Sequence, residues 1–303
     1  MEHRPTIALL VPVYNGANYI VEFCEHLKEL TSTFDEVIFY NDGSTDDSLN
    51  LIKKSGYKYI TAETNKGVGA ARNMLAQTTQ CNYIHFHDVD DKFSSTFVEE
   101  VKTVIVNDHA EVIFGDCDWI DIGNKAVLIR WRYSQAELSA KPADYLLANP
   151  LGIINTVYHA DTFRSINGFN EDLNCWEDAD IHIRLALAGT RFKHIDNTIA
   201  FSLRHGHGLS GDQLWCWECR LKFLERYLCD YSDLLNKSTI ESEIKKVQNV
   251  FILSGNFSKL KKIIDLKAKY NLNLNTDKIY ILHLLSKIIP LGLLFPLVKK
   301  MIK

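Results

Sequence analysis

The sequence lacks a secretory signal, an internal repeat and a low-complexity linker. Its early apolar run, Ile7–Val13, is too short for a signal and has no cleavage pattern. A mean hydropathy of -0.12 argues against a protein that crosses a membrane several times. The seven cysteines are scattered and odd in number, which argues against a disulfide framework. We therefore expect a cytoplasmic protein whose cysteines are reduced.

Arginine is absent from residues 237–303, which hold 13 lysines and 4 acidic residues. The net charge of this tail is therefore +9, and since the whole chain carries -4, the preceding residues carry -13. A basic tail on an acidic body favours a polyanionic partner, either a membrane surface or nucleic acid. Because the tail lacks the arginines typical of nucleic-acid binding, we expect no nucleic-acid partner.

The segment Ile279–Val298 is rich in isoleucine and leucine but is interrupted by Lys287, Pro290 and Pro296. Two prolines and a lysine argue against a membrane-spanning helix. A basic, apolar segment that ends in lysines suits the anionic inner face of a membrane. Packing of a helical subdomain on the core or on a partner chain is an equally good interpretation.

Short β-rich runs alternate with helix-period runs over the first 200 residues. We expect early strands at Thr6–Val13, Glu36–Tyr40, Tyr57–Thr61 and Asn82–Phe86, with helices after them that include Asp46–Lys54, Val68–Thr78 and Ser94–Val106. This order predicts an α/β fold with a central, mainly parallel sheet.

Later elements are less regular. We expect a strand pair across Asp118–Trp131, a strand at Ile153–Tyr158, a helix at Asp178–Ala188 and two strands at Phe192–Ile195 and Thr198–Leu203. From Gln213 onward the chain is rich in lysine, and we expect it to be helical. We expect two domains, 1–211 and 212–303.

Polar residues follow the first, second and fourth expected strands, at Asn15, at Asn41–Ser44 and at His87–Asp91. In α/β folds of this type, ligands bind beyond the carboxyl ends of the strands. The chain segment before Asn15, which includes Pro12 and Tyr14, is placed to stack on or hydrogen-bond a base. The clustering of polar residues at strand ends predicts a binding site there.

Asp88, Asp90 and Asp91 follow directly after an apolar strand. Carboxylates so close together repel one another unless a hard cation lies among them. Mg²⁺ or Mn²⁺ prefers one or two carboxylates together with substrate phosphates. Such an ion would neutralise the charge of a departing diphosphate. The alternative is a solvated loop with an acidic helix start.

Two further loops carry candidate donor contacts. Asp42 can accept a hydrogen bond from an imide or ribose group, and Gly43 allows close backbone approach. The alternative is a turn followed by a helix cap. The glycines after Lys66 can suit a phosphate, although they make a weak dinucleotide fingerprint. Arg72 is a candidate diphosphate or sugar contact, or else part of a surface ion pair.

Glu177 and Asp178 open a helix, where they either compensate the helix dipole or act on a substrate. His205 and His207 flank Gly206 in a loop that can complete a metal site, clamp phosphate or simply lie at the surface. Cys216 and Cys219 form a lone Cys-x-x-Cys, which we interpret as helix packing rather than zinc binding.

In series these motifs resemble those of inverting glycosyltransferases of family 2, which have the GT-A fold. The matching landmarks, in the family's order over residues 5–210, are Val11–Asn15, Asn41–Asp46, Asn65–Asn73, Asp88–Asp91 and Glu177–Asp178. Where this family often has glycine before its Glu-Asp pair, this chain has Trp176.

The resemblance implies a role for each matching residue. It places Asp42 on the base and Asp88 on the ribose or base. Asp90 holds Mn²⁺ or Mg²⁺, with His207 or alternatively His205, and Asp178 is the catalytic base. Further donor contacts are expected from Pro12, Tyr14, Asn15, Lys66, Arg72 and Val89, and acceptor contacts from Trp176 and Glu177.

The resemblance also implies an activity, the transfer of a hexosyl or N-acetylhexosaminyl group from a UDP-sugar to a glycan or lipid-linked glycan. Surface polysaccharide or lipopolysaccharide synthesis is the expected setting. A catalytically silent nucleotide-sugar-binding module of the same fold is the alternative.

Overall fold

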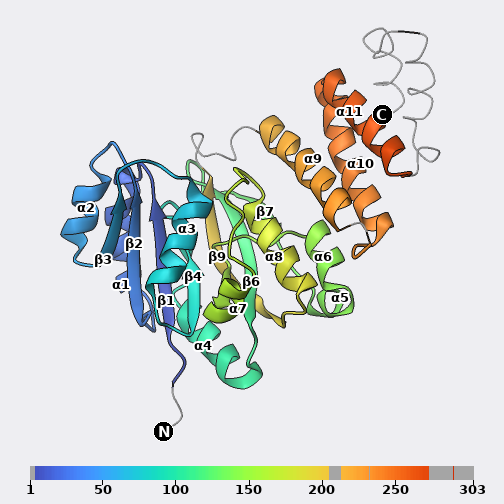
Figure 1. Cartoon of the computed structure of the whole chain (residues 1–303). Coiled ribbons are helices and arrows are strands. Elements are labelled where there is room, and N and C mark those ends of the chain that lie inside the picture. The colour runs from blue at the N-terminus through green and yellow to red at the C-terminus, as the bar shows by residue number, and fades with distance from the viewer. Residues whose placement is uncertain (1–3, 205–212, 232, 273–288, 290–303) are drawn as a thin grey trace. The chain divides into compact units, whose positions relative to one another are not determined.

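The computed structural model describes residues 4–204, 213–231, 233–272 and 289. The chain divides into two compact units, Met1–Gly208 and Leu209–Lys303. Each unit has its own secondary structure (Figure 1).

The first unit contains nine strands and eight helices in its described part. The strands are β1 (Ile7–Val13), β2 (Glu36–Asp42), β3 (Lys58–Ala62), β4 (Tyr83–Phe86), β5 (Lys92–Phe93), β6 (Val112–Asp121), β7 (Val127–Trp131), β8 (Thr156–His159) and β9 (Phe192–Arg204). The helices are α1 (Ala17–Lys28), α2 (Ser48–Ser55), α3 (Val68–Thr78), α4 (Phe97–Asp108), α5 (Gln135–Ala140), α6 (Pro142–Ala148), α7 (Ala160–Ser165) and α8 (Glu177–Leu187).

All nine strands join one sheet with the order β3-β2-β1-β4-β8-β6-β9-β5, and β7 pairs with β6 outside this path. The first four strands are parallel to one another, as the alternation of strands and helices predicts. Strand β8 then runs antiparallel to both β4 and β6, whereas β9 runs parallel to β6. The carboxyl ends of β1, β2 and β4 therefore meet at one edge of the sheet.

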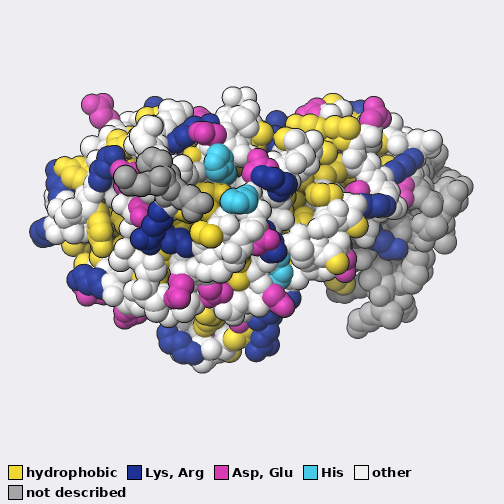
Figure 2. All heavy atoms as spheres, turned by 90° about the horizontal axis from the view of Figure 1, so that it is seen from below, with side chains coloured by type: hydrophobic (Ala, Val, Ile, Leu, Met, Phe, Trp, Pro, Cys, Tyr) yellow, Lys and Arg dark blue, Asp and Glu magenta, His cyan; other side chains and the backbone are white. Residues whose placement is uncertain are grey.

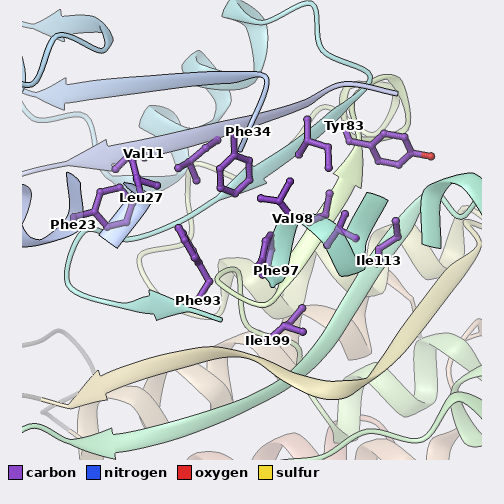
Figure 3. Close-up of a cluster of buried hydrophobic side chains, with 14 of the residues drawn as sticks. Val11, Phe23, Leu27, Phe34, Tyr83, Phe93, Phe97, Val98, Ile113 and Ile199 are labelled. Carbon is purple, nitrogen blue, oxygen red and sulfur yellow. The ribbon is translucent and has the colours of Figure 1, made fainter. Parts of the chain in front are cut away.

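Two apolar clusters cover the two faces of this sheet. Alternate residues of β1 divide between them, because successive side chains of a strand point to opposite faces. Ile7, Leu9 and Val11 belong to the cluster that includes Phe23 of α1 and Phe97 of α4. Figure 3 shows Val11, Phe23 and Phe97 among the side chains of this cluster. The opposite cluster contains Ala8 and Leu10 of β1, and its helical residues come from α3, α7 and α8. The result is three layers, helix, sheet and helix, with the core in two parts.

Strand β9 differs from the expected pair of strands. It is continuous from Phe192 to Arg204, but its register with β6 jumps from Gly115↔Ile195 to Asp116↔Thr198. The polar residues between the two expected strands therefore form a bulge within one continuous strand. Helices α5 and α7 were not expected, and α4 begins at Phe97 after Thr96 rather than near Ser94.

The second unit contains α9 (Gln213–Asp230), α10 (Lys237–Ser254) and α11 (Phe257–Lys269). Arg220 and Glu243, which join α9 to α10 through a buried ion pair at 3.0 Å, are both almost fully buried. Cys216 and Cys219 both lie on α9. None of the helices that the structure describes is long and apolar enough to cross a bilayer. Apart from Ile289, the expected membrane-surface segment lies outside the described residues.

A candidate active site at the carboxyl ends of the strands

The loops after β1 and β2 are tied together by Asn15. This residue has a left-handed backbone, with φ of 52°. Its side-chain Oδ1 accepts the Thr45 N–H at 2.8 Å, and its own N–H donates to Ser44 Oγ at 3.0 Å. Asn15 therefore fixes the end of β1 against the Asp42-Gly43-Ser44 turn. Tyr14, beside it, has 52% of its surface exposed and is accessible to a ligand.

Asp42 at the end of β2 holds the loop that leads into α3. Its carboxylate is buried and accepts the backbone N–H groups of Lys66 at 2.9 Å and Gly67 at 3.0 Å. An ionised carboxylate offers about four acceptor positions. Two of these are occupied by the loop, so Asp42 can organise the loop and still accept a hydrogen bond from a base.

Gly43 cannot be replaced by alanine without moving this loop. Its φ is +66°, and a Cβ would lie 2.5 Å from the Thr64 carbonyl carbon. We expect Gly43→Ala to destabilise the fold by about 1–3 kcal/mol through backbone strain, and by more through the clash. Gly56→Ala is the matched control, because its φ is +78° but no atom lies within 4 Å of the added Cβ. Urea denaturation of both variants measures the difference, and equal losses would contradict the clash.

Arg72 on α3 connects two loops that are far apart in the sequence. One amino group donates to Asp88 at 3.0 Å, and the other donates to Glu177 Oε1 at 2.9 Å. The Arg72 side chain is only 4% exposed, against 37% for Asp88 and 15% for Glu177. The ion pair that the sequence offered as the alternative therefore forms, but the guanidinium is buried rather than at the surface. It brings the loop after β4 beside the start of α8, on which Asp178 follows Glu177.

Asp91 has a structural role in the acidic loop. One of its oxygens accepts the Leu203 N–H at 2.7 Å, which fixes the loop against the end of β9. Burial, together with the carboxylates of Asp90 and Asp88, raises the pKa of Asp91 well above its usual value. Asp88, Asp90 and Asp91 are all partly buried, and 37% of the Asp88 side chain is exposed. Because a backbone N–H already occupies Asp91, Asp88 and Asp90 are the better candidates for contact with a ligand.

Asp178 is the first-turn carboxylate of α8. The helix starts after Trp176, whose φ of 69° turns the chain sharply at this point. Asp178 Oδ1 accepts the Ala179 N–H at 2.7 Å. Burial and the neighbouring Glu177 raise the pKa of Asp178 to about 7, although the Arg72 guanidinium opposes this rise. A carboxylate with such a pKa takes up a proton readily near neutral pH.

Tyr158 and His182 form a buried pair that the sequence did not reveal as part of the site. The Tyr158 hydroxyl lies 2.6 Å from His182 Nε2, and burial lowers the pKa of His182 to about 3. The imidazole is therefore neutral, and its tautomer decides which of the two groups donates the hydrogen. His182 lies one helical turn after Asp178, and this i, i+4 spacing was the available signal.

The acidic loop does not form a ready-made metal cage. Nowhere in the described part of the chain do three His, Cys, Asp or Glu side chains gather as ligands for an ion. His205 and His207, the expected histidine ligands, lie outside the described residues. A cation at Asp90 would therefore require oxygen ligands from a substrate or from outside the described segments.

The sequence matches the family described as glycosyl transferase family 2 over residues 8–166, and the chain belongs to this family. It is 26% identical over 222 residues to a chondroitin synthase of Escherichia coli, which covers 69% of this chain and 30% of that relative. Among the curated relatives, three share 26–30% identity and this chain spans 30–57% of their length.

Solved structures share the fold. S. aureus TarS 1–349 in complex with UDP-GlcNAc aligns with a TM-score of 0.65 at 17% identity, over 88% of this chain and 80% of that 1–349 chain. The mannosyltransferase PcManGT from Pyrobaculum calidifontis, in complex with GDP-Man and Mn²⁺, aligns with a TM-score of 0.58 at 12% identity, over 89% and 83% of the two chains. The expected GT-A-type fold with C-terminal helices is confirmed.

Proposed function

We propose that this chain is an inverting glycosyltransferase that transfers a sugar from a UDP-linked donor to a hydroxyl group of a glycan. The observation that supports this most strongly is the Asp88–Arg72–Glu177 bridge, because it brings the acidic loop beside the start of α8. The reaction needs one carboxylate to hold a cation on the donor diphosphate and another nearby to take the proton from the acceptor hydroxyl. Relatives named as chondroitin and hyaluronan synthases, and a neighbour bound to UDP-GlcNAc, favour a UDP-linked hexosyl or N-acetylhexosaminyl donor.

The donor pocket is assigned to the three loops at the carboxyl edge of the sheet. Asp42 receives the base, and Asp88 the ribose or base. Arg72 is assigned an indirect role in this pocket. Both of its amino groups already bind carboxylates, so it holds these carboxylates in place. The remaining donor contacts are assigned to Pro12, Tyr14, Asn15, Lys66 and Val89.

The carboxylate oxygens of the acidic loop fit a hard divalent cation. Asp90 is partly buried in this loop, and Asp88 keeps 37% of its side chain exposed. Mg²⁺ and Mn²⁺ need only one or two such carboxylates when phosphate oxygens complete the shell. Asp90 would hold the ion, and His207 or His205 would add a ligand. When bound, the ion neutralises charge on the diphosphate as it departs.

The mechanism assigned to the chain's own residues is a single displacement. Asp178 takes the proton from the acceptor hydroxyl as the oxygen attacks the anomeric carbon. The donor loops hold the diphosphate on the opposite side, so the configuration inverts. The sugar–oxygen bond to the acceptor forms as the bond to the diphosphate breaks. Trp176 and Glu177, beside Asp178, are assigned to the acceptor.

A glycan or lipid-linked glycan of a surface polysaccharide or lipopolysaccharide is the proposed acceptor, at the inner face of the cytoplasmic membrane. The basic charge of residues 237–303 supports this setting, because anionic lipids attract lysine-rich segments.

A panel of nucleotide sugars tests the proposal. We expect one UDP-sugar to raise the melting temperature in the presence of Mn²⁺ and to release UDP slowly by hydrolysis. Removal of the ion with EDTA should abolish both effects. Failure of every nucleotide sugar to stabilise the protein would contradict the proposed function.

Asp90→Asn should remove metal-dependent donor binding. The change removes the carboxylate charge that is proposed to hold the ion, so we expect loss of the Mn²⁺-dependent thermal shift with UDP. Asp172→Asn is the matched control, because Asp172 is exposed in a loop. An Asp90→Asn protein that binds UDP and Mn²⁺ as the wild type does would exclude Asp90 as the ligand.

A further inference from the structure

An aromatic and cationic surface adjoins the acidic loop on β6, β7 and β9. It consists of Trp119, Trp131 and Arg204, and none of its residues belongs to the family motifs identified in the sequence. The Trp119 and Trp131 rings have centroids 6.1 Å apart. The Arg204 guanidinium carbon lies 3.3 Å from the centroid of the Trp119 ring.

The register of β6 places this surface on the same face of the sheet as Asp91. Trp119 pairs with Ser202 of the parallel strand β9, so both side chains point to one face. The Ser202 hydroxyl lies 3.5 Å from Asp91 Oδ2. Trp131 lies on this face too, because it pairs with Cys117 and packs in the same small cluster as Trp119. The surface is thus continuous with the loop that carries Asp90.

Trp119 and Trp131 are both only partly buried, so part of each residue is exposed. Flat apolar rings suit the C–H face of a pyranose, whose burial gains the usual free energy of apolar contact. At 3.3 Å the guanidinium plane of Arg204 must lie nearly parallel to the Trp119 ring. The N–H groups then point along the ring plane rather than into it, and this planar set of donors matches carboxylate and phosphate oxygens.

We propose that Trp119, Trp131 and Arg204 form the acceptor subsite and that the acceptor carries an anionic group on its sugar. This inference rests on the proposed transferase function. The indole rings bind the sugar ring, and Arg204 binds the carboxylate or phosphate. The position of the surface beside the acidic loop places the acceptor next to the donor diphosphate.

Binding of simple sugars by saturation-transfer NMR tests the proposal, with the protein saturated by UDP and diamagnetic Mg²⁺. The probes are methyl glucuronide, glucose 6-phosphate and neutral methyl glucoside. We expect the anionic probes to bind about tenfold more tightly than methyl glucoside, since hydrogen bonds to charged groups are the stronger ones. Either anionic probe binding more tightly supports the proposal, and their order identifies the anion. Equal binding of all three probes would overturn it.

Variants separate the two parts of the surface. Arg204→Gln should abolish the preference for anionic probes, and Trp119→Ala should weaken all three, with Trp119→Phe restoring most of the binding. Arg130→Gln is the matched control, because Arg130 pairs with Asp118 and so points to the opposite face of the same hairpin. If Arg204→Gln instead weakened UDP binding and left the probes unaffected, Arg204 would serve the donor and the proposal would fail.

UDP binding by the same samples keeps this test apart from the test of the proposed function. Absence of UDP and UDP-sugar binding in the wild type would contradict the transferase function itself. UDP binding without any preference for anionic probes would contradict the acceptor subsite alone.

Discussion

Asp178→Asn is expected to lower the rate of sugar transfer by about 10²- to 10⁴-fold, the usual contribution of a general base. An amide has nearly the same shape as the carboxylate but cannot take a proton. Donor binding should therefore be unchanged, which a thermal shift with UDP-sugar and Mn²⁺ measures. Rates come from single-turnover transfer with a saturating donor.

Asp180→Asn is an unsuitable control because Asp180 forms a buried ion pair with Arg184 at 2.7 Å, so Asp172→Asn is used again. Transfer by the Asp178→Asn protein at the wild-type rate would show that another group removes the proton.

The pH dependence of transfer follows from the same carboxyl. Only the ionised form of Asp178 can accept a proton, and its pKa is raised to about 7 by burial and by Glu177. We therefore expect kcat/KM to rise with pH through about 7 and to level off above it. A rate that is independent of pH between 5 and 8 would contradict the assignment.

Arg72→Met is expected to cost about 3–5 kcal/mol of folding stability, because it leaves the Asp88 and Glu177 carboxylates without their buried cation. It should also raise the pKa of Asp178, since the Arg72 charge lowers it, and so move the rise in kcat/KM to higher pH. Urea denaturation and a pH–rate profile measure the two effects.

Arg191→Met is the matched control for Arg72→Met. The Arg191 side chain is 68% exposed and its ion pair with Glu111 is 3.5 Å long, so its loss should cost at most about 1 kcal/mol. Similar losses in the two variants would show that the Arg72 bridge contributes no more than a surface pair.

The first half of the sheet could be predicted from the sequence because local patterns determine it. Strands such as β1 are short apolar runs. β1 ends at Val13, just before Asn15, and a helix-period run follows it. The sequence also placed the acidic loop after β4 and Glu177 and Asp178 at the start of a helix, as the structure has them. The roles assigned to these residues stay predictions. The assignment to family 2 is confirmed by the match over residues 8–166.

The rest depended on contacts that no local pattern carries. Arg72 and Glu177 are 105 residues apart, so their ion pair could not be inferred from spacing. The bulge in β9 opposite Asp116 arises from pairing with β6, and a sequence pattern shows it only as a break between strands. The proximity of Trp119 to Asp91 likewise follows from the register of three strands.

The direct test of the central claim is whether a cation held by Asp90 lies beside Asp178. In protein labelled with ¹⁵N-tryptophan, the Trp176 indole signal, assigned with Trp176→Phe, reports on the start of α8. Paramagnetic Mn²⁺ added with UDP should broaden this signal in the wild type and leave it sharp in Asp90→Asn. A Trp176 signal that stays sharp while Mn²⁺ and UDP are bound would contradict the account.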